Sequence, residues 1–286
     1  MRYEAPESLE AAVALLASGA GEARVLAGGT DLLVQLKTDV IEPQLLVDIK
    51  RIAAVREIRR EAGGFRIGAA VTGAELKEHP ELKTVWPGVI EAANLIGSTQ
   101  IQGRATLGGN LCNASPAADS VPALIAAGAI ATVVGPDGQR EMAVEDVVLG
   151  PRQLALAKGE FVVSFLLPPR SPRSADAYLR FIPRTEMDIA VVGAGVNLTL
   201  DESGVITAAR VALGAVAARP LLVPEAGAAL CGSSLDDAAL SRFEAAVRAA
   251  CQPIDDKRGT REFRIKVAGV MARRAAHKAY ERARSR

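Results

Sequence analysis

The sequence predicts an α+β protein built from two domains, and three observations carry this prediction. The chain has 286 residues, whereas a single hydrophobic core rarely grows beyond roughly 250 residues. Residues 168–174 combine three prolines with polar side chains, which is typical of a boundary loop. Beyond that loop, strand-like runs precede helices, which indicates an α+β domain. We therefore expect an N-terminal domain over residues 1–170 and a C-terminal domain over residues 175–286.

The chain begins with a pattern of helix, strand and glycine turn. Ser8 can cap a helix with an apolar face. A short apolar strand is expected over residues 23–27, and it leads directly into the turn Gly28-Gly29-Thr30-Asp31. Residues 32–36 can form a helical turn behind it.

The rest of the N-terminal domain is predicted to mix strands and helices. Thr72 and Glu75 have the spacing of a capping box, so a helix should begin there and end at Pro80. Residues 97–116 form a long polar, glycine-rich passage. The remaining apolar runs predict strands at 45–49, 65–70, 131–134 and 161–167, and helices at 89–96 and 117–129.

The C-terminal domain is predicted to contain a hairpin and two helices. Residues 190–200 and 205–216 are strand-like runs joined by a polar turn, which indicates antiparallel pairing. Helices are expected at 236–250 and 260–282. Basic residues gather between 257 and 286, and we interpret them as the solvated face of an amphipathic terminal helix.

Composition excludes several classes of protein. The 34 Lys and Arg residues nearly balance the 33 Asp and Glu residues, so a nucleic-acid partner is not expected. The sequence contains no apolar run of membrane-spanning length and no signal peptide, so a cytoplasmic protein is expected. Cys112, Cys231 and Cys251 are too dispersed for a disulfide framework or a metal site. Any iron–sulfur centre must therefore belong to another chain.

Two Gly-Gly turns are the strongest candidates for a binding site. They lie at residues 27–31 and 106–110, and each ends in small polar side chains. Successive backbone amides in such turns form a concave nest for anions, because glycine permits positive φ and close approach. Two nests suit a diphosphate better than a single phosphate.

Other interpretations of these glycines remain open at this point. Gly-Gly pairs are common in ordinary hairpins, so both turns can be purely structural. Neither turn matches the phosphate-loop pattern or the GxGxxG pattern. Gly193 and Gly195 lie inside a predicted strand, which disfavours a Rossmann site.

Side chains suited to acid–base catalysis are scarce. His79 and His277 are the two histidines, and both are expected on the surface. The sequence contains no hydrolytic triad and no set of metal ligands, so we predict neither catalytic nor metal-binding residues. Nucleotide-binding turns without an acid–base pair indicate that a bound cofactor performs the chemistry.

At these turns the sequence resembles the FAD-binding subunit of the molybdenum hydroxylases, the group of xanthine dehydrogenase and aerobic carbon monoxide dehydrogenase. LAGGTDLL at residues 26–33 and ATLGGNLCNASPAAD at residues 105–119 are similar to the two flavin-diphosphate loops of that family. RTEMDIAVVGAGV from Arg184 and GTREFRIKVAGVMARRA from Gly259 are similar to its C-terminal domain. The resemblance covers nearly the whole chain.

The resemblance implies an FAD-binding fold of the vanillyl-alcohol oxidase type, with α+β subdomains at about 1–55 and 56–170 and a further α+β domain. Thr30 and Thr106 would add hydroxyl donors to the amides around the diphosphate, and Asp119 would bind near the adenosine ribose. The residues it places at FAD are Leu26, Ala27, Gly28, Gly29, Thr30, Asp31, Leu32, Ile96, Thr106, Leu107, Gly108, Gly109, Asn110, Asp119, Val163 and Arg180. Of these, Ile96 and Val163 would make apolar contacts.

Two departures from the family pattern stand out. Some relatives have a lysine where this chain has Arg180, so the role of that side chain is open. Many relatives read QIRN where this chain has Gln100-Ile-Gln-Gly103, a difference that would alter loop contacts without removing the site.

The function implied by the resemblance is electron transfer. A partner with molybdopterin would hydroxylate the substrate, and a small partner with two [2Fe-2S] clusters would pass electrons to non-covalent FAD on this chain. NAD, oxygen or another compound would accept them. The substrate would bind in the molybdenum subunit, so purines, carbon monoxide, nicotinate and aldehydes remain open, although GGNLCNASPAAD is most similar to xanthine-dehydrogenase-type relatives.

Two alternatives remain. A free-standing flavin oxidase of the same fold would need its own substrate pocket, and Cys112 is the candidate for a covalent flavin tether. A flavin-free scaffold subunit would have kept the fold without the ligand, although both glycine turns are intact.

Overall fold

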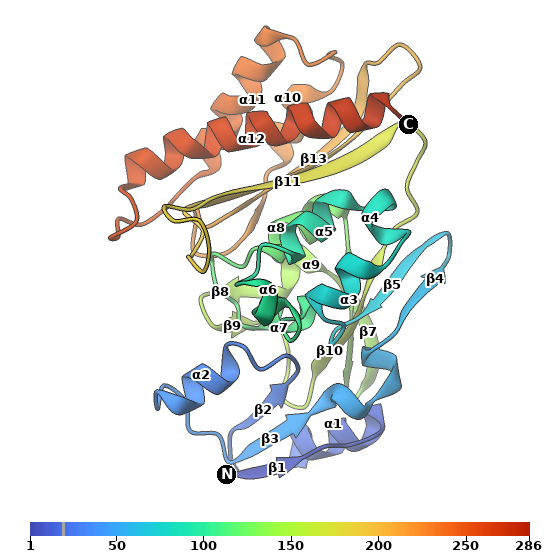
Figure 1. The fold of residues 1–286 in the computed structure, drawn as a ribbon, viewed down its shortest axis with the longest axis vertical. Coiled ribbons are helices and arrows are strands. Elements are labelled where there is room, and N and C mark those ends of the chain that lie inside the picture. The colour runs from blue at the N-terminus through green and yellow to red at the C-terminus, as the bar shows by residue number, and fades with distance from the viewer. Residues whose placement is uncertain (19–20) are drawn as a thin grey trace.

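The computed structural model describes residues 1–18 and 21–286. Its elements form three parts stacked along the long axis, from the N-terminal end to the C-terminal end (Figure 1). A small parallel sheet lies at one end, a five-stranded antiparallel sheet with many short helices lies in the middle, and a four-stranded antiparallel sheet lies at the other end.

The N-terminal part is a three-stranded parallel sheet with strand order β1-β3-β2. Helix α1 packs Ala12 and Leu16 into a hydrophobic cluster with the fully buried Val47 of the central strand. The elements are β1 (Arg2–Glu4), α1 (Leu9–Ser18), β2 (Ala23–Leu26), α2 (Leu32–Lys37), β3 (Leu45–Asp48) and the 3₁₀ turns η1 (Ile49–Arg51) and η2 (Ala53–Val55).

The middle part is an antiparallel sheet with strand order β4-β5-β10-β6-β7. Its strands are β4 (Ile58–Glu61), β5 (Gly64–Gly68), β6 (Ile130–Gly135), β7 (Gly138–Ala143) and β10 (Phe161–Leu167), with a small hairpin of β8 (Val148–Gly150) and β9 (Gln153–Leu154). Its helices are α3 (Gly73–Glu78), α4 (Leu82–Val85), α5 (Pro87–Ala93), α6 (Thr99–Gln102), α7 (Leu107–Cys112), α8 (Ser120–Ala127) and α9 (Val144–Val147). Helix α8 is buried along its whole length, because it lies between this part and the C-terminal sheet.

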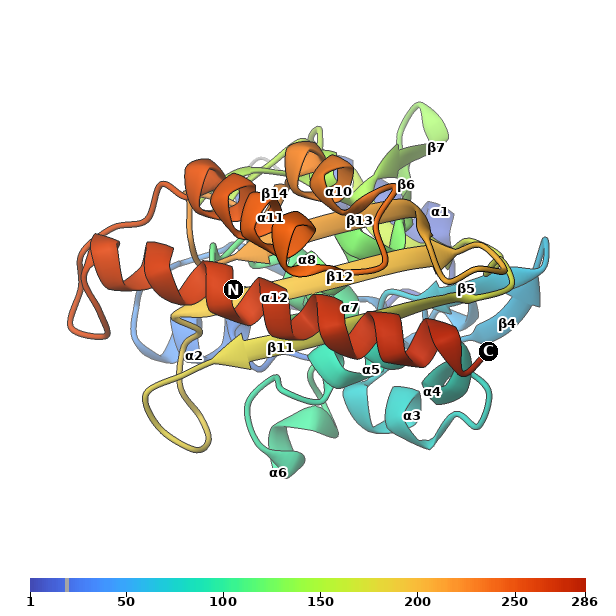
Figure 2. The same ribbon diagram turned by 90° about the horizontal axis from the view of Figure 1, so that it is seen from above.

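The C-terminal part is a four-stranded sheet enclosed by helices on both faces (Figure 2). Helices α10 to α12 cover one face, whereas α5 and α8 of the middle part pack against the other. A side chain at Gly195 would lie 2.7 Å from the Pro122 carbonyl oxygen, so glycine is needed where β12 meets α8. The elements are β11 (Ser174–Phe181), β12 (Val192–Leu200), β13 (Ile206–Gly214), β14 (Leu221–Leu222), α10 (Pro224–Leu230), α11 (Asp237–Ala250) and α12 (Arg261–Arg284).

Several predicted elements differ from the structure. The capping box of Thr72 and Glu75 is present, and β12 and β13 pair antiparallel as predicted. Strands β4, β7 and β11 and helix α7 were missed, and β11 begins inside the predicted boundary loop. Helix α8 starts at Ser120 rather than at residue 117, and α5 ends at Ala93, so Ile96 lies in the following turn.

The prediction of a solvated basic face on the terminal helix is wrong for several residues. Arg264 is only 4% exposed and donates to the Val191 carbonyl at 3.0 Å. Lys278 and Arg282 both form ion pairs with Glu91 of helix α5. These basic side chains therefore bind groups on the parts of the molecule that the helix covers.

Candidate functional site

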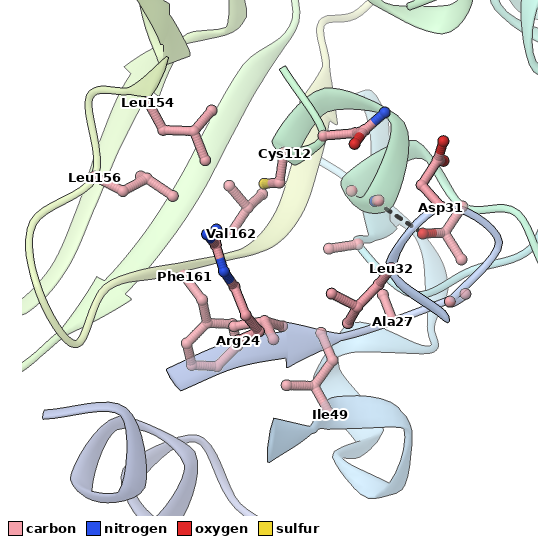
Figure 3. Close-up of a pocket in the computed structure, with 18 of the residues that line it drawn as sticks. Arg24, Ala27, Asp31, Leu32, Ile49, Cys112, Leu154, Leu156, Phe161 and Val162 are labelled. Atoms are coloured by element: carbon pink, nitrogen blue, oxygen red, sulfur yellow. Dashed lines mark hydrogen bonds between the residues drawn. The ribbon is translucent and has the colours of Figure 1, made fainter. Parts of the chain in front are cut away.

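A cavity of about 610 Å³ lies between the N-terminal part and the middle part of the molecule. Strand β2 and the first glycine turn form one side, where Arg24, Ala27 and Leu32 are found (Figure 3). Helix α7 with Cys112 and strand β10 with Val162 form another side. Its volume falls within the range of about 300–1,000 Å³ that is typical of ligand and cofactor sites.

The first glycine turn closes tightly against the second. A side chain at Gly28 would overlap the carbonyl oxygen of Arg104, so only glycine allows this contact between the two backbones. Gly29 has a φ of +77°, in the left-handed region that favours glycine. The apolar sequence before the turn is strand β2, which places the turn at the edge of the cavity.

The amide groups of this turn are available to a ligand. Within the part of the chain that the structure describes, the N–H groups of Gly28, Gly29, Thr30 and Asp31 donate to no carbonyl or side chain. Amides at a cavity wall that have no partner in the protein can donate to a bound ligand. Burial raises the pKa of the Asp31 carboxyl above its ordinary value.

The second glycine turn begins helix α7. The Thr106 Oγ1 atom accepts a hydrogen bond from the Gly109 N–H at 2.9 Å, so the hydroxyl proton can be donated elsewhere. Gly108 donates its N–H to the Ala69 carbonyl, and a side chain there would lie 2.6 Å from that oxygen. The Asn110 Oδ1 atom accepts from both the N–H and the hydroxyl of Ser120, which ties α7 to α8.

Eleven of the sixteen predicted site residues line this one cavity. They are Ala27, Gly28, Gly29, Thr30, Asp31, Leu32, Ile96, Thr106, Gly108, Gly109 and Asn110. Leu26, Leu107, Asp119, Val163 and Arg180 do not line it. Leu26, Leu107 and Val163 are buried apolar side chains, and Val163 belongs to the N-terminal hydrophobic cluster. Contact of each residue with FAD stays a prediction.

Asp119 and Arg180 instead form a buried ion pair beside the cavity wall. Arg180 Nη1 donates to Asp119 Oδ2 at 2.8 Å and to the Leu95 carbonyl at 2.6 Å. The Tyr178 hydroxyl donates to Asp119 Oδ1 at 3.3 Å. Because Ile96 follows Leu95 and lines the cavity, the pair connects strand β11 with that wall. Burial raises the pKa of Asp119 to about 6, although the positive charge of Arg180 opposes the shift.

This raised pKa predicts a specific pH dependence of stability. A carboxyl whose pKa is higher in the folded state binds its proton more tightly when the protein is folded. Its contribution to the free energy of unfolding is therefore fully present at low pH. That contribution is lost as the pH rises from about 4 to about 6. We expect the free energy of unfolding of the wild type to fall by roughly 2 kcal/mol over this range relative to Asp119→Asn. Urea unfolding at several pH values measures the difference, and parallel curves for the two proteins would contradict the prediction.

Other residues of the cavity wall were missed in the sequence. They include Arg24, Ile49, Cys112, Arg152, Leu154, Leu156, Phe161 and Val162. Phe161 and Val162 lie at the start of the predicted strand, but the pattern did not show which of its side chains reach the cavity. Burial raises the pKa of the Cys112 thiol to about 12. Its thiolate, the form that reacts with a flavin, is therefore scarce.

Comparison with known proteins identifies the family. Residues 1–170 match the FAD binding domain in molybdopterin dehydrogenase, and residues 177–279 match the CO dehydrogenase flavoprotein C-terminal domain. The chain belongs to the molybdopterin dehydrogenase flavoproteins. Across residues 1–18 and 21–286 of this flavoprotein, no group of three His, Cys, Asp or Glu side chains could hold a metal ion.

Relatives of this flavoprotein match it along almost its whole length. The carbon monoxide dehydrogenase medium chain of Afipia carboxidovorans is 36% identical over 283 residues, which cover 99% of this chain and 98% of the relative. The xanthine dehydrogenase FAD-binding subunit of Escherichia coli O157:H7 is 30% identical over 279 residues, covering 97% and 95%. These names do not single out purines as substrates.

A solved structure supports the same assignment. Reconstituted CO dehydrogenase from Oligotropha carboxidovorans contains a chain that superimposes on this flavoprotein with a TM-score of 0.94 at 36% identity, covering 99% of this chain and 98% of that one. The predicted family, the α+β FAD-binding fold and the assignment as an oxidoreductase subunit are thereby confirmed.

Proposed function

We propose that this chain is the electron-transfer subunit of a molybdenum hydroxylase. A large subunit with molybdopterin oxidises the substrate, and a small subunit with [2Fe-2S] clusters relays the electrons to this chain. The chain delivers them to NAD, oxygen or another acceptor through the FAD that it holds. FAD supplies the redox chemistry when bound, and the protein supplies binding and orientation.

One observation carries the proposal most directly, namely the two glycine turns that face one cavity. The unpaired amides of residues 28–31 and the hydroxyl proton of Thr106 are donors suited to a diphosphate. The close contact of Gly28 with the Arg104 backbone brings the two sets of donors together. The amides of residues 28–31 and the hydroxyl of Thr106 thus fit the diphosphate of FAD, and apolar residues of the same cavity such as Leu154 and Leu156 fit its rings.

The partners are expected by analogy with relatives that are named medium chain or FAD-binding subunit. The structure describes no helix that is long and apolar enough to cross a membrane. The three cysteines are unpaired thiols, which supports a reducing compartment such as the cytoplasm. The domain limits at 170 and 175 also stay a prediction. Two hydrophobic clusters support them, since one lies entirely beyond residue 174 and the other lies before residue 168 except for Tyr178 and Ala212.

The experiment that tests this proposal is purification of the full chain with the chains that accompany it. We expect flavin and iron–sulfur absorption, two co-purifying chains, and release of all the flavin as FAD on acid precipitation. We expect release because burial raises the pKa of the Cys112 thiol to about 12 and so keeps its reactive thiolate scarce. Cys112→Ser should therefore retain its flavin.

Other outcomes would favour the alternatives. Flavin that stays in the acid pellet, and is lost from it in Cys112→Ser, would indicate a tethered oxidase. A colourless protein that binds no FAD even with its partners present would indicate a scaffold subunit.

A further inference from the structure

Lys50 binds the first glycine turn from behind the cavity. Its Nζ atom donates to the Ala27 carbonyl oxygen at 3.0 Å and lies 2.8 Å from Asp48 Oδ1. Lys50 lies in turn η1, directly after Ile49, which reaches the cavity edge near Ala27 and Leu32 (Figure 3). Neither the sequence pattern nor the family resemblance singled out this lysine.

A second cavity of about 210 Å³ adjoins the larger cavity that we propose holds FAD. It is lined by Lys50, Arg56 and Arg104, and it shares Gly28 and Thr106 with the larger cavity. Gly28 of the first glycine turn therefore lines both cavities. Lys50 lines the second cavity but not the larger one.

The bond from Lys50 fixes the direction of the next amide. The described chain contains no cis peptide bond, so the carbonyl of Ala27 and the N–H of Gly28 point in opposite directions. Because the carbonyl points to Lys50, the N–H of Gly28 points away from the second cavity. That N–H has no partner within the described residues.

The glycine turns carry no positive side chain of their own. Residues 26–32 and 105–113 include Asp31 but no lysine or arginine. Lys50 is thus the ammonium group that is hydrogen-bonded to the first turn. Asp48 holds it in place, because its carboxylate accepts from Tyr3, from the Lys50 backbone N–H and from Nζ. Burial would raise the pKa of Asp48, but these hydrogen bonds outweigh it and lower the pKa.

We propose that Lys50 is a positioning residue of the FAD site, which binds the Ala27 carbonyl and so turns the amides of the first glycine turn toward the diphosphate. This inference rests on the proposed function, because it requires FAD in the larger cavity. It predicts that the lysine acts on the diphosphate end of the cofactor without touching it.

The test is FAD and ADP binding to the full chain of four variants. We expect Lys50→Met to weaken both ligands by the same factor, about tenfold to a hundredfold, because both contain the diphosphate. Lys50→Arg should recover most of the affinity, since a guanidinium can donate to the same carbonyl. Arg51→Met is the matched control, because Arg51 is 67% exposed, lies 3.9 Å from Glu7, and should leave both affinities unchanged.

Asp48→Asn tests how Lys50 is held. The amide keeps an oxygen acceptor but removes the ion pair with Nζ, so FAD and ADP should both bind more weakly than in the wild type and more tightly than in Lys50→Met. The recovery in Lys50→Arg separates positioning from a merely structural role, because a purely structural lysine would not be replaced by another donor to the Ala27 carbonyl. Two results in Lys50→Met would overturn the inference about Lys50 and leave the proposed function intact. They are wild-type affinity for both ligands, or a loss of FAD binding without a loss of ADP binding. A wild-type chain that binds no FAD would overturn the proposed function instead.

Discussion

Replacing Gly28 by alanine is expected to raise the FAD dissociation constant by about a hundredfold or more, which corresponds to about 2.7 kcal/mol. The added Cβ atom would overlap the Arg104 carbonyl oxygen and lie 3.2 Å from the Cα atom of Ala105. Both obstacles are backbone atoms, so the two turns must move apart to make room. The unpaired amides of residues 28–31 and the hydroxyl of Thr106 would then no longer converge on one diphosphate.

The measurement is flavin binding by the purified full chain, together with thermal unfolding of the flavin-free protein to show that it is folded. Gly103→Ala is the matched control in the neighbouring segment, because Gly103 has a φ of −66° and the nearest atom to an added Cβ is 3.5 Å away. It should change the affinity by no more than about twofold. Equal affinity in Gly28→Ala and Gly103→Ala would show that the contact between the turns does not matter for FAD.

The sequence predicted elements well where a regular apolar pattern meets a clear stop. Residues 161–167 form an uninterrupted apolar run apart from Ser164, and the structure has β10 at these positions. Strand β11 was missed because Asp176 and Arg180 interrupt its apolar residues. Both side chains are buried in ion pairs, Asp176 with Arg170 six positions before it and Arg180 with the distant Asp119, and a single sequence does not display such pairs.

Helix α7 was missed for a different reason. Its sequence LGGNLC contains two glycines, which have low intrinsic helix propensity. The structure stabilises it from outside the segment, through the cap from Thr106 and the hydrogen bond from Gly108 to the Ala69 carbonyl. Tertiary contacts therefore decide this helix.

In the candidate site, too, some features could be predicted from the sequence and others depend on tertiary contacts. Both glycine turns could be found in the sequence, because glycine at Gly28 and Gly29 reflects a close contact and a positive φ. Lys50 could not be found, because its link to Ala27 spans 23 positions and depends on the pairing of β2 with β3. The sequence therefore indicates the glycine turns whose backbone we propose to bind FAD, whereas only the structure reveals Lys50, the side chain that we propose to orient them.

Replacing Asp176 by alanine is expected to lower the free energy of unfolding by about 3–5 kcal/mol, which makes it the largest stability effect that we predict. Asp176 Oδ1 accepts from Arg170 Nη2 at 2.7 Å, and Oδ2 accepts from the Val89 N–H at 3.1 Å. The two charged side chains are only 3% and 7% exposed, and the Arg170 guanidinium lies 3.7 Å over the Trp86 ring. Burial lowers the pKa of Arg170 to about 10, so this residue still carries its positive charge at neutral pH.

The reason for so large a loss is the charge that remains. Without the carboxylate, Arg170 stays buried with no anion beside it, and the Val89 N–H loses its acceptor. Urea unfolding of the full chain measures the effect, and Asp237→Ala is the control because its carboxylate is 95% exposed and should contribute at most about 1 kcal/mol. The double variant Asp176→Leu with Arg170→Met should recover much of the loss, since it removes both charges together. A loss in Asp176→Ala no larger than in Asp237→Ala, or no recovery in the double variant, would show that the buried charge is not what couples β11 to α5.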